Sequence, residues 1–296
     1  MKGIQYSPIL AEANRANFDT NTTQIKTETR RTSGLKKVNE SPDRYAFTTM
    51  VTDEVKGEYL AHFYDTHANE SFYIKSPYGK PLDLLYVREE HYAYGHWEPT
   101  SETTKGGNQK WAFKKTGPVR FNDNPPPQFE TGIIRRNVSN WHRRTALFMP
   151  ASYAKQFNII TEITIERLTD ITEESAIREG IQPMDFEPIW GGKCYRDYSI
   201  SDADLLDKYG NPKLDFPVMA LARDSFFTLI QKIHTPQILN DNPWVWVIKY
   251  LPLSITGKPT QQQIAEVKKL LRQKPNYQFH KVGTALLQYS NSPITQ

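Results

Sequence analysis

The 296-residue sequence has a single cysteine, Cys194, and no long apolar run. One cysteine excludes an internal disulfide framework and a cysteine-rich zinc site. No stretch approaches the ~18 apolar residues that cross a bilayer, and residues 1–6 lack the apolar segment of a signal peptide. These absences predict a protein of the reducing cytoplasm that has no membrane partner.

The sequence also lacks the motifs of common cofactor and metal sites. It contains neither of the glycine patterns that cradle nucleotide phosphates, so no cofactor is expected. His91 and His96 lie close to the acidic pair Glu89 and Glu90. No HExxH pattern and no neighbouring cysteine accompany them, and we therefore expect no metal site.

Strand patterns outnumber helical patterns along the chain. The 20 prolines and the 12% of aromatic residues favour strands and turns. Residues 98–132 form a long exposed excursion in this interpretation, and residues 183–215 are irregular. Strands are predicted at 2–6, 45–51, 58–64, 71–74, 84–94, 111–114, 158–168 and 243–248, and helices at 8–18, 173–179, 217–234 and 261–273. This mixture predicts an α+β domain built on a β-barrel with peripheral helices.

The formal net charge of +4 is distributed unevenly. Residues 105–145 hold nine Lys/Arg and two Asp/Glu, residues 159–230 hold seven and fourteen, and residues 256–296 hold six and one. Basic segments on both sides of an acidic one indicate an anionic partner on one side of the molecule. Ordinary unevenness of surface charge is the alternative.

The densest polar cluster is the run Lys26-Thr27-Glu28-Thr29-Arg30-Arg31. As a helix it would gather Lys26, Thr29 and Arg30 on one face. As a strand it would place its first, third and fifth residues on one side and the other three on the opposite side. An amine, a hydroxyl and a guanidinium together can bind phosphate or activate threonine as a nucleophile. A solvated surface turn is the alternative.

Aromatic residues are interleaved with cations in two further segments. These segments contain Trp111, Phe113, Lys114 and Lys115, and then Trp141, Arg143 and Arg144. Rings can stack on bases while cations hold phosphates, so both segments are candidates for nucleic-acid contact. Core packing is the alternative for each tryptophan, and we expect it for Trp244 and Trp246, which lie in an almost wholly apolar run.

Four segments carry a resemblance to a known family. Residues 26–31 contain a lysine, a threonine three positions later and paired arginines, and residues 78–89 end in Val-Arg-Glu. Together with residues 166–181 and 242–248, they resemble the bacteriophage and prophage branch of the ASCH domain, whose mixed β-barrel is related to the PUA fold. The resemblance implies a barrel domain at 1–252 with insertions at about 32–70 and 93–135, followed by a basic helical extension at 253–296.

The resemblance also implies a cytoplasmic, phage- or prophage-encoded protein whose cleft binds RNA or a modified nucleoside. Some relatives remove the acetyl group from acetylated cytidine with a lysine, a threonine and a glutamate, which match Lys26, Thr29 and Glu89 by position. The nucleic-acid contacts would come from Arg30, Arg31, Trp141, Arg143 and Arg144. Two departures stand out: the glycine that commonly precedes the lysine is absent, and residues 148–152 lack the histidine, arginine and tryptophan that are common in the family.

Three functions therefore remain open from the sequence. The first is a nucleic-acid or modified-nucleoside binding protein without catalysis. The second is an amidohydrolase that deacetylates a modified base with Lys26, Thr29 and Glu89, or a ribonuclease, unless Glu89 is clamped by Arg30 or Arg31 in a structural role. The third is a phage scaffold that inhibits a host defence system, with a protein partner bound through residues 253–296.

Overall fold

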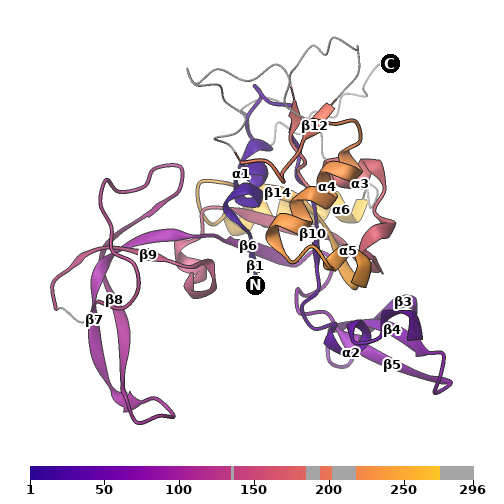
Figure 1. Cartoon of the computed structure of the whole chain (residues 1–296), viewed down its shortest axis with the longest axis horizontal. Helices are drawn as coiled ribbons and strands as arrows, with labels where there is room; N and C mark the ends of the chain where they lie inside the picture. The colour runs from indigo at the N-terminus through magenta and orange to yellow at the C-terminus, as the bar shows by residue number, and fades with distance from the viewer. Residues whose placement is uncertain (135–136, 185–193, 202–217, 274–296) are drawn as a thin grey trace.

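A five-stranded sheet forms the centre of the molecule (Figure 1). The computed structural model describes residues 1–134, 137–184, 194–201 and 218–273. In spatial order the strands are β1 (Lys2–Gln5), β6 (Leu84–Arg88), β10 (Phe157–Arg167), β14 (Trp244–Ser254) and β2 (Glu28–Arg31). β1 and β6 are parallel, and the other neighbours are antiparallel.

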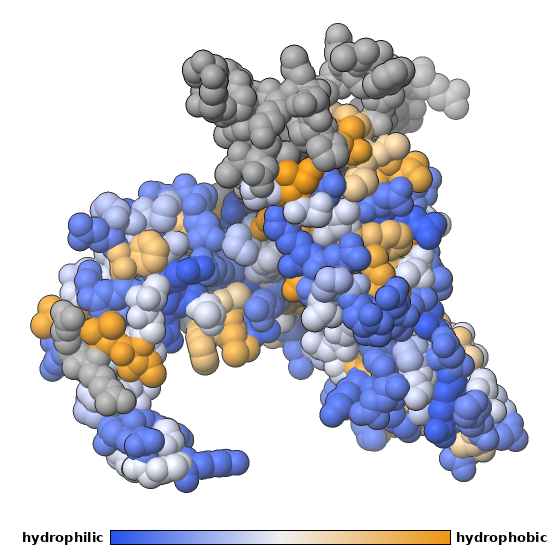
Figure 2. Space-filling model, in the orientation of Figure 1, coloured by the Kyte–Doolittle hydropathy of each residue, from blue (hydrophilic) through white to orange (hydrophobic). Residues whose placement is uncertain are grey.

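Two small sheets project from the central body (Figure 1). The first contains β3 (Tyr45–Asp53), β4 (Glu58–Asp65) and β5 (Glu70–Lys75). The second, which we call the arm, contains β8 (Gln109–Phe121), β7 (His91–Thr103) and β9 (Asn140–Arg144), in that order. The visible surface of both projections is largely hydrophilic, with hydrophobic side chains on part of the arm (Figure 2).

Helices and short turns surround the central sheet. Ser7 caps α1, and Pro8 occupies its first turn, where a missing N–H costs nothing. The carboxylate of Glu173 accepts hydrogen bonds from the backbone N–H groups of Ala222 and Arg223, so α4 begins at 222. The helices are α1 (Pro8–Ala16), α2 (Lys36–Asn39), α3 (Glu173–Arg178), α4 (Ala222–Ile233), α5 (Ile238–Asp241) and α6 (Gln261–Gln273). Shorter elements are η1 (Pro42–Arg44), η2 (Ala146–Phe148), η3 (Ala151–Tyr153), η4 (Leu168–Asp170), β11 (Pro183–Met184), β12 (Cys194–Arg196) and β13 (Val218–Met219).

Strand β14 is buried on both faces, as its apolar sequence predicts. Trp246 packs in the main core with Phe226 of α4, while Leu251 packs in a second core against Val267 of α6. Trp246 is fully buried, and the half-buried Trp244 packs against the main core. The apolar stripe of α6 is therefore covered by the sheet.

The predicted α+β class is confirmed, but the strands described do not close into a barrel. The predicted strand at 84–94 divides at Glu89 and Glu90, because β6 belongs to the central sheet and β7 to the arm. The predicted excursion at 98–132 is mostly a hairpin of β7 and β8. Helix 217–234 begins at 222, and most of the irregular stretch 183–215 lies outside the described residues. Among the residues that the structure describes, no helix is long and apolar enough to cross a membrane.

Gly180 ends α3 at the point where three segments meet. Its φ of +92° is a conformation that L side chains rarely adopt. A Cβ atom at this position would lie 2.8 Å from Cβ of Ala13 and 3.0 Å from Cβ of Lys26. The glycine therefore lets α1 and the start of β2 approach the end of α3, which brings Lys26 next to Glu179.

We expect Gly180→Ala to lower the free energy of unfolding by about 2–4 kcal/mol, through backbone strain and the contact with Ala13. Gly107→Ala is the matched control, because Gly107 also has a positive φ (+78°) but has nothing within 4 Å of the added Cβ. The control should lose only about 1 kcal/mol. Urea denaturation of the two variants measures the difference, and equal losses would contradict the packing argument.

Candidate functional site

Residues 26–31 form an edge of the central sheet. β2 pairs with β14 in antiparallel register, with Thr29 opposite Ile248. Lys26 forms a separate β-bridge with Glu179. The strand interpretation of this run is confirmed and the helical one is wrong, because its backbone hydrogen bonds go to β14 instead of to its own turns.

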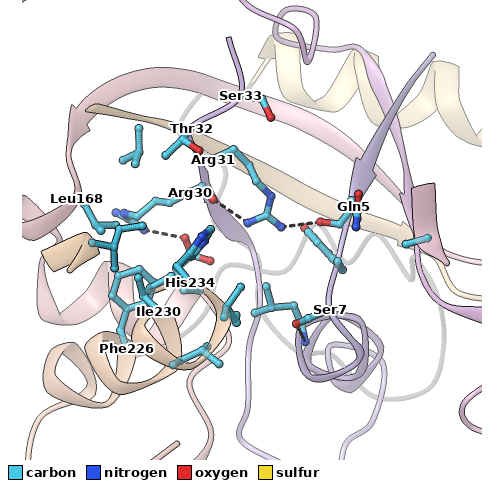
Figure 3. Close-up of a pocket in the computed structure, with 18 of the residues that line it drawn as sticks. Gln5, Ser7, Arg30, Arg31, Thr32, Ser33, Leu168, Phe226, Ile230 and His234 are labelled. Atoms are coloured by element: carbon cyan, nitrogen blue, oxygen red, sulfur yellow. Dashed lines mark hydrogen bonds and ion pairs between the residues drawn. The ribbon is translucent and has the colours of Figure 1, made fainter. Parts of the chain in front are cut away.

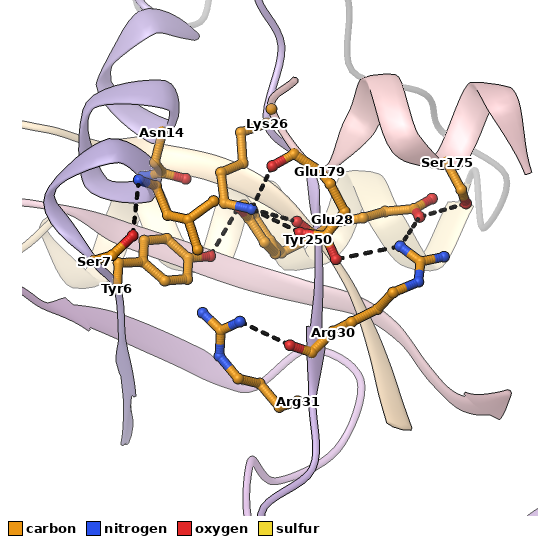
Figure 4. Close-up of polar contacts among 12 residues, drawn as sticks. Tyr6, Ser7, Asn14, Lys26, Glu28, Arg30, Arg31, Ser175, Glu179 and Tyr250 are labelled. Carbon is orange, nitrogen blue, oxygen red and sulfur yellow. Dashed lines mark hydrogen bonds and ion pairs between the residues drawn. The ribbon is translucent and has the colours of Figure 1, made fainter. Parts of the chain in front are cut away.

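Lys26 is fully buried, and three acceptors hold its amine (Figure 4). Nζ donates to the backbone oxygens of Glu179 at 2.7 Å and of Glu28 at 2.9 Å, and to Oε2 of Glu179 at 3.0 Å. Asn17 of the segment after α1 bonds both the backbone N–H and the carbonyl of Lys26. The three donors of the ammonium group are therefore all in use.

The pKa values of this ion pair reflect burial and opposite charge. Burial lowers the pKa of Lys26 to about 8, although the charge of Glu179 opposes the change. Burial alone would raise the pKa of Glu179, but the charges of Lys26 and Arg30 outweigh it and hold that pKa below its ordinary value. Both groups are consequently ionised near pH 7.

The other buried charges on this side of β2 are also compensated. Arg30 donates from Nε to Glu166 at 2.6 Å and from Nη1 to Glu179 at 3.2 Å. Glu28 accepts from Nε of Arg178 at 2.6 Å. The cluster thus combines three cations with three carboxylates: Lys26, Arg30 and Arg178 with Glu28, Glu166 and Glu179.

Thr29 is fully buried near the phenol of Tyr6. Within the described residues its hydroxyl makes no hydrogen bond of ordinary geometry. Tyr6 donates instead to the phenol of Tyr250 at 2.8 Å. The predicted nucleophile therefore has no base hydrogen-bonded to it in the described part of the chain.

Glu89 lies between β6 and β7 and is 2% exposed. Its Oε2 accepts from Nη1 of Arg15 at 2.6 Å, and its Oε1 accepts from Nε2 of Gln156 at 3.0 Å. Gln156 in turn accepts from Asn14 at 2.8 Å. Glu89 is thus clamped by an arginine, but this arginine comes from α1 and not from the run at 26–31.

Arg31 differs from its neighbours because, in the described ranges, no carboxylate pairs with it. Its Nη1 donates to the carbonyl of Arg30 at 2.7 Å and its Nη2 to the carbonyl of Gln5 at 2.9 Å. The guanidinium carbon lies 5.3 Å from the ring centroid of Tyr6. Arg31 is on β2 and Gln5 is on β1, and these are the two edge strands of the sheet. The side chain of Arg31 therefore connects the two edges, which do not pair with each other.

A pocket of about 440 Å³ lies beside Arg31 (Figure 3). Leu168 and two residues of α4, Phe226 and Ile230, contribute apolar lining. Polar lining comes from both sheet edges, the start of α1, the arm and the ends of α3 and α4: Gln5, Ser7, Arg30, Arg31, Thr32, Ser33, Glu90, Thr145, Glu179 and His234. The pocket therefore has an apolar side and a polar side that carries both arginines and carboxylates.

His234 lines the same pocket at the end of α4. Burial and the charge of Arg31 lower the pKa of His234, so its imidazole is neutral near pH 7. Sequence reasoning missed His234 and Tyr6 as pocket residues. The sequence placed His234 at the end of a predicted helix, and that position alone does not indicate a ligand site.

The structure brings together only some of the residues predicted as a site. Arg30 and Arg31 line the pocket, whereas Lys26, Thr29 and Glu89 do not. Those three side chains also have no hydrogen-bond partner in common in the part of the chain described.

Trp141, Arg143 and Arg144 lie on β9 of the arm, next to Thr145 and Ala146, which do line the pocket. Trp141 packs against Tyr94 with ring centroids 5.6 Å apart. The rings of His91 and His96 contact the backbone of Glu89 and the side chains of Ser139 and Glu98.

Comparisons with known proteins give no match. No family model, no curated protein and no solved structure matches the chain. The resemblance to the ASCH domain stays a prediction, and the function has to be argued from the geometry of the pocket and of the charges around it.

We expect Lys26→Met to lower the free energy of unfolding by about 3 kcal/mol or more. The variant leaves the buried carboxylate of Glu179 without the positive charge of Lys26. It also leaves the backbone carbonyls of Glu28 and Glu179 without the hydrogen bonds that the amine donates. Lys249→Met is the control, because Lys249 of β14 forms a solvent-exposed ion pair with Glu162 of β10. Urea denaturation at pH 7 should show a loss below about 1 kcal/mol for the control. Similar losses in both variants would contradict a structural role for Lys26.

The cost of Lys26→Met should also grow with pH. The folded-state pKa of about 8 is lower than the unfolded value of 10.5. Between these values the unfolded chain binds more protons at Lys26, so stability rises with pH by about 1 kcal/mol per pH unit in the wild type but not in the variant. Denaturation at pH 7, 8, 9 and 10 measures the difference, and a constant difference would rule out the lowered pKa.

Proposed function

We propose that this protein binds an RNA base or a modified nucleotide in the pocket between β1 and β2, without catalysing a reaction. The observation that carries the proposal is Arg31. No carboxylate lies within ion-pair distance of its guanidinium in the described structure, and it lies at the wall of a pocket of about 440 Å³. An anionic group on a ligand would supply the missing partner.

The size and lining of the pocket support a ligand with an apolar and an anionic part. A volume of about 440 Å³ falls within the range typical of small-molecule sites. Phe226 and Ile230 offer a surface for a base, and Arg31 offers donors for a phosphate. The positive end of the α1 dipole, at Ser7 and Pro8, adds to the attraction for an anion.

The proposal keeps the ASCH domain as the family and the PUA-like barrel as the fold that this chain resembles. In the open sheet, Arg31 of edge strand β2 donates a hydrogen bond to the carbonyl of Gln5 on the other edge strand, β1, beside the pocket. Fold alone does not fix function, so the pocket residues carry the argument.

The alternative functions have less support. An amidohydrolase needs a nucleophile and a base that reach one substrate, yet Lys26, Thr29 and Glu89 are buried and do not line the pocket. A ribonuclease would need a similar arrangement. A scaffold that uses residues 253–296 would gain support from a free apolar face on α6, but Val267 and Leu271 are buried against the sheet.

Isothermal titration with cytidine, acetylated cytidine and cytidine monophosphate tests the proposal. We expect the monophosphate to bind most tightly and Arg31→Ala to weaken its binding by about 10- to 100-fold, since hydrogen bonds to charged groups contribute about 1.5–3 kcal/mol. Arg31→Lys should recover part of the loss.

Arg272→Ala is the control, because Arg272 is exposed in the last turn of α6 and does not line the pocket. It should bind the monophosphate like the wild type. Unchanged affinity in Arg31→Ala would reject the pocket as the site, and release of cytidine from acetylated cytidine would favour the hydrolase.

A further inference from the structure

Strand β9 divides the cations of the arm between two faces. Successive strand residues point to opposite sides, so Arg143 and Arg144 face in opposite directions. Arg143 pairs with Glu90, whereas Arg144 contacts the rings of Trp97 and Phe113. We call the side of Arg144 the ring face and the side of Arg143 the paired face.

Two cations on the paired face have carboxylate partners, and a third, Arg120, lies 5.1 Å from the ring centroid of Trp141. Arg143 lies 2.6 Å from Oε2 of Glu90, and Lys114 lies 2.9 Å from Oε1 of Glu98. These pairs neutralise much of the charge on this side of the arm.

Cations on the ring face have aromatic neighbours instead. The guanidinium carbon of Arg144 lies 4.7 Å from the centroids of Trp97 and Phe113 and 5.5 Å from that of Phe148. Nζ of Lys115 lies 5.3 Å from the ring of Tyr153. Within the described ranges, neither cation has a carboxylate within ion-pair distance. Arg144 and Lys115 thus place two cations without a carboxylate at ion-pair distance, in the described ranges, on one face of the arm.

The backbone of β7 is adapted to this arrangement at Gly95. A Cβ atom there would lie 2.2 Å from the carbonyl oxygen of Lys114 and 2.9 Å from Cζ of Phe113, so glycine allows β8 and this ring to approach closely. The ring in turn supports Arg144. At the root of the arm, Nζ of Lys155 lies 4.6 Å from the ring of Phe121, which pairs with His91. From His91 to Trp97 the ring face extends over roughly 20 Å.

A half-buried cation without a counter-ion is an incomplete site. Burial lowers the pKa of Arg144, and no carboxylate offsets this effect. Cation–π contacts recover only about 0.5–2 kcal/mol. An anion placed over this face would complete the pairing, and exposed rings beside it would accept planar groups.

We infer that the ring face of the arm binds single-stranded nucleic acid. Phosphates would lie near Arg144, Lys115 and Lys155, and bases would stack on Phe148, which is 64% exposed, and on Tyr153. A duplex would bury its bases away from these rings, and an acidic protein or an anionic membrane would not need them. Charge and exposed rings together favour an unpaired strand.

The ring face is continuous with the pocket along the chain. Arg144 is followed directly by Thr145 and Ala146, which line the pocket. A strand on the arm could therefore deliver one nucleotide to Arg31. The inference about the arm builds on the proposed function, but it concerns residues outside the pocket, so each can fail without the other.

Fluorescence anisotropy with a labelled twelve-nucleotide RNA, at 50 and 200 mM salt, tests the inference. The double variant Lys115→Gln with Arg144→Gln should weaken binding at least about 10-fold. It should also reduce the slope of log K against log salt concentration by about two, because two phosphate contacts are lost. Phe148→Ala, a change at an exposed side chain, should weaken it by about 5-fold or more without changing the salt slope. Melting temperatures close to that of the wild type would show that the variants are folded.

The matched control is Lys110→Gln with Lys114→Gln. It removes the same charge from the same strand, but both lysines already pair with carboxylates, Glu102 and Glu98. It should bind RNA nearly as well as the wild type. The arm variants should also bind cytidine monophosphate like the wild type, whereas Arg31→Ala should not.

Three results would overturn the inference. The first is equal RNA affinity in the wild type and in the Lys115/Arg144 double variant. The second is equal loss in the Lys110/Lys114 control, which would mean that only net charge matters. The third is tighter binding to duplex RNA or to anionic vesicles than to the single strand.

Discussion

The structure depends on the buried contact between Lys26 and Glu179. It joins an edge strand of the central sheet to the end of α3, and the same amine also bonds two backbone carbonyls. A buried carboxylate at a helix C-terminus is opposed by the helix dipole, so Glu179 requires cations nearby. Lys26 and Arg30 supply them, and Gly180 provides the close approach. This contact explains why Lys26 has a structural role even though its pKa lies close to 8.

Compensation within this cluster determines what remains for a ligand. Both arginines line the pocket, but Arg30 is committed to Glu166 and Glu179, so Arg31 is the member of the pair that has no ion-paired carboxylate in the described ranges. Its two carbonyl partners orient the guanidinium across the sheet opening, and in the described structure no carboxylate comes within ion-pair distance of it. The ion pairs of Arg30 in the interior and the lack of an ion-paired carboxylate at Arg31, in the described ranges, therefore have the same origin.

Local sequence predicted the elements of this site but not its contacts. The Pro8 start of α1, the Gly180 end of α3 and the apolar stripe of α6 were readable because each depends on a few neighbouring residues. The partners of Lys26 and Glu89 were not, since Glu179 and Arg15 are 153 and 74 positions away. Glu179 did carry a signal: an acid in the last turn of a helix needs a cation. The hairpin at 98–132 was predicted only in part, as a strand at 111–114, because its glycines and prolines resemble a loop.

The two Arg-Arg pairs follow the same physical logic. In each, strand alternation sends neighbouring guanidinium groups to opposite sides. Arg30 and Arg143 meet carboxylates, while Arg31 and Arg144 rest on aromatic rings. The sequence shows that the two arginines of each pair point to opposite sides of a strand. It does not show which arginine is paired with a carboxylate, because the carboxylates come from distant segments. A ring holds a cation without cancelling its charge, and each of the two proposed binding sites includes one of these two ring-supported arginines.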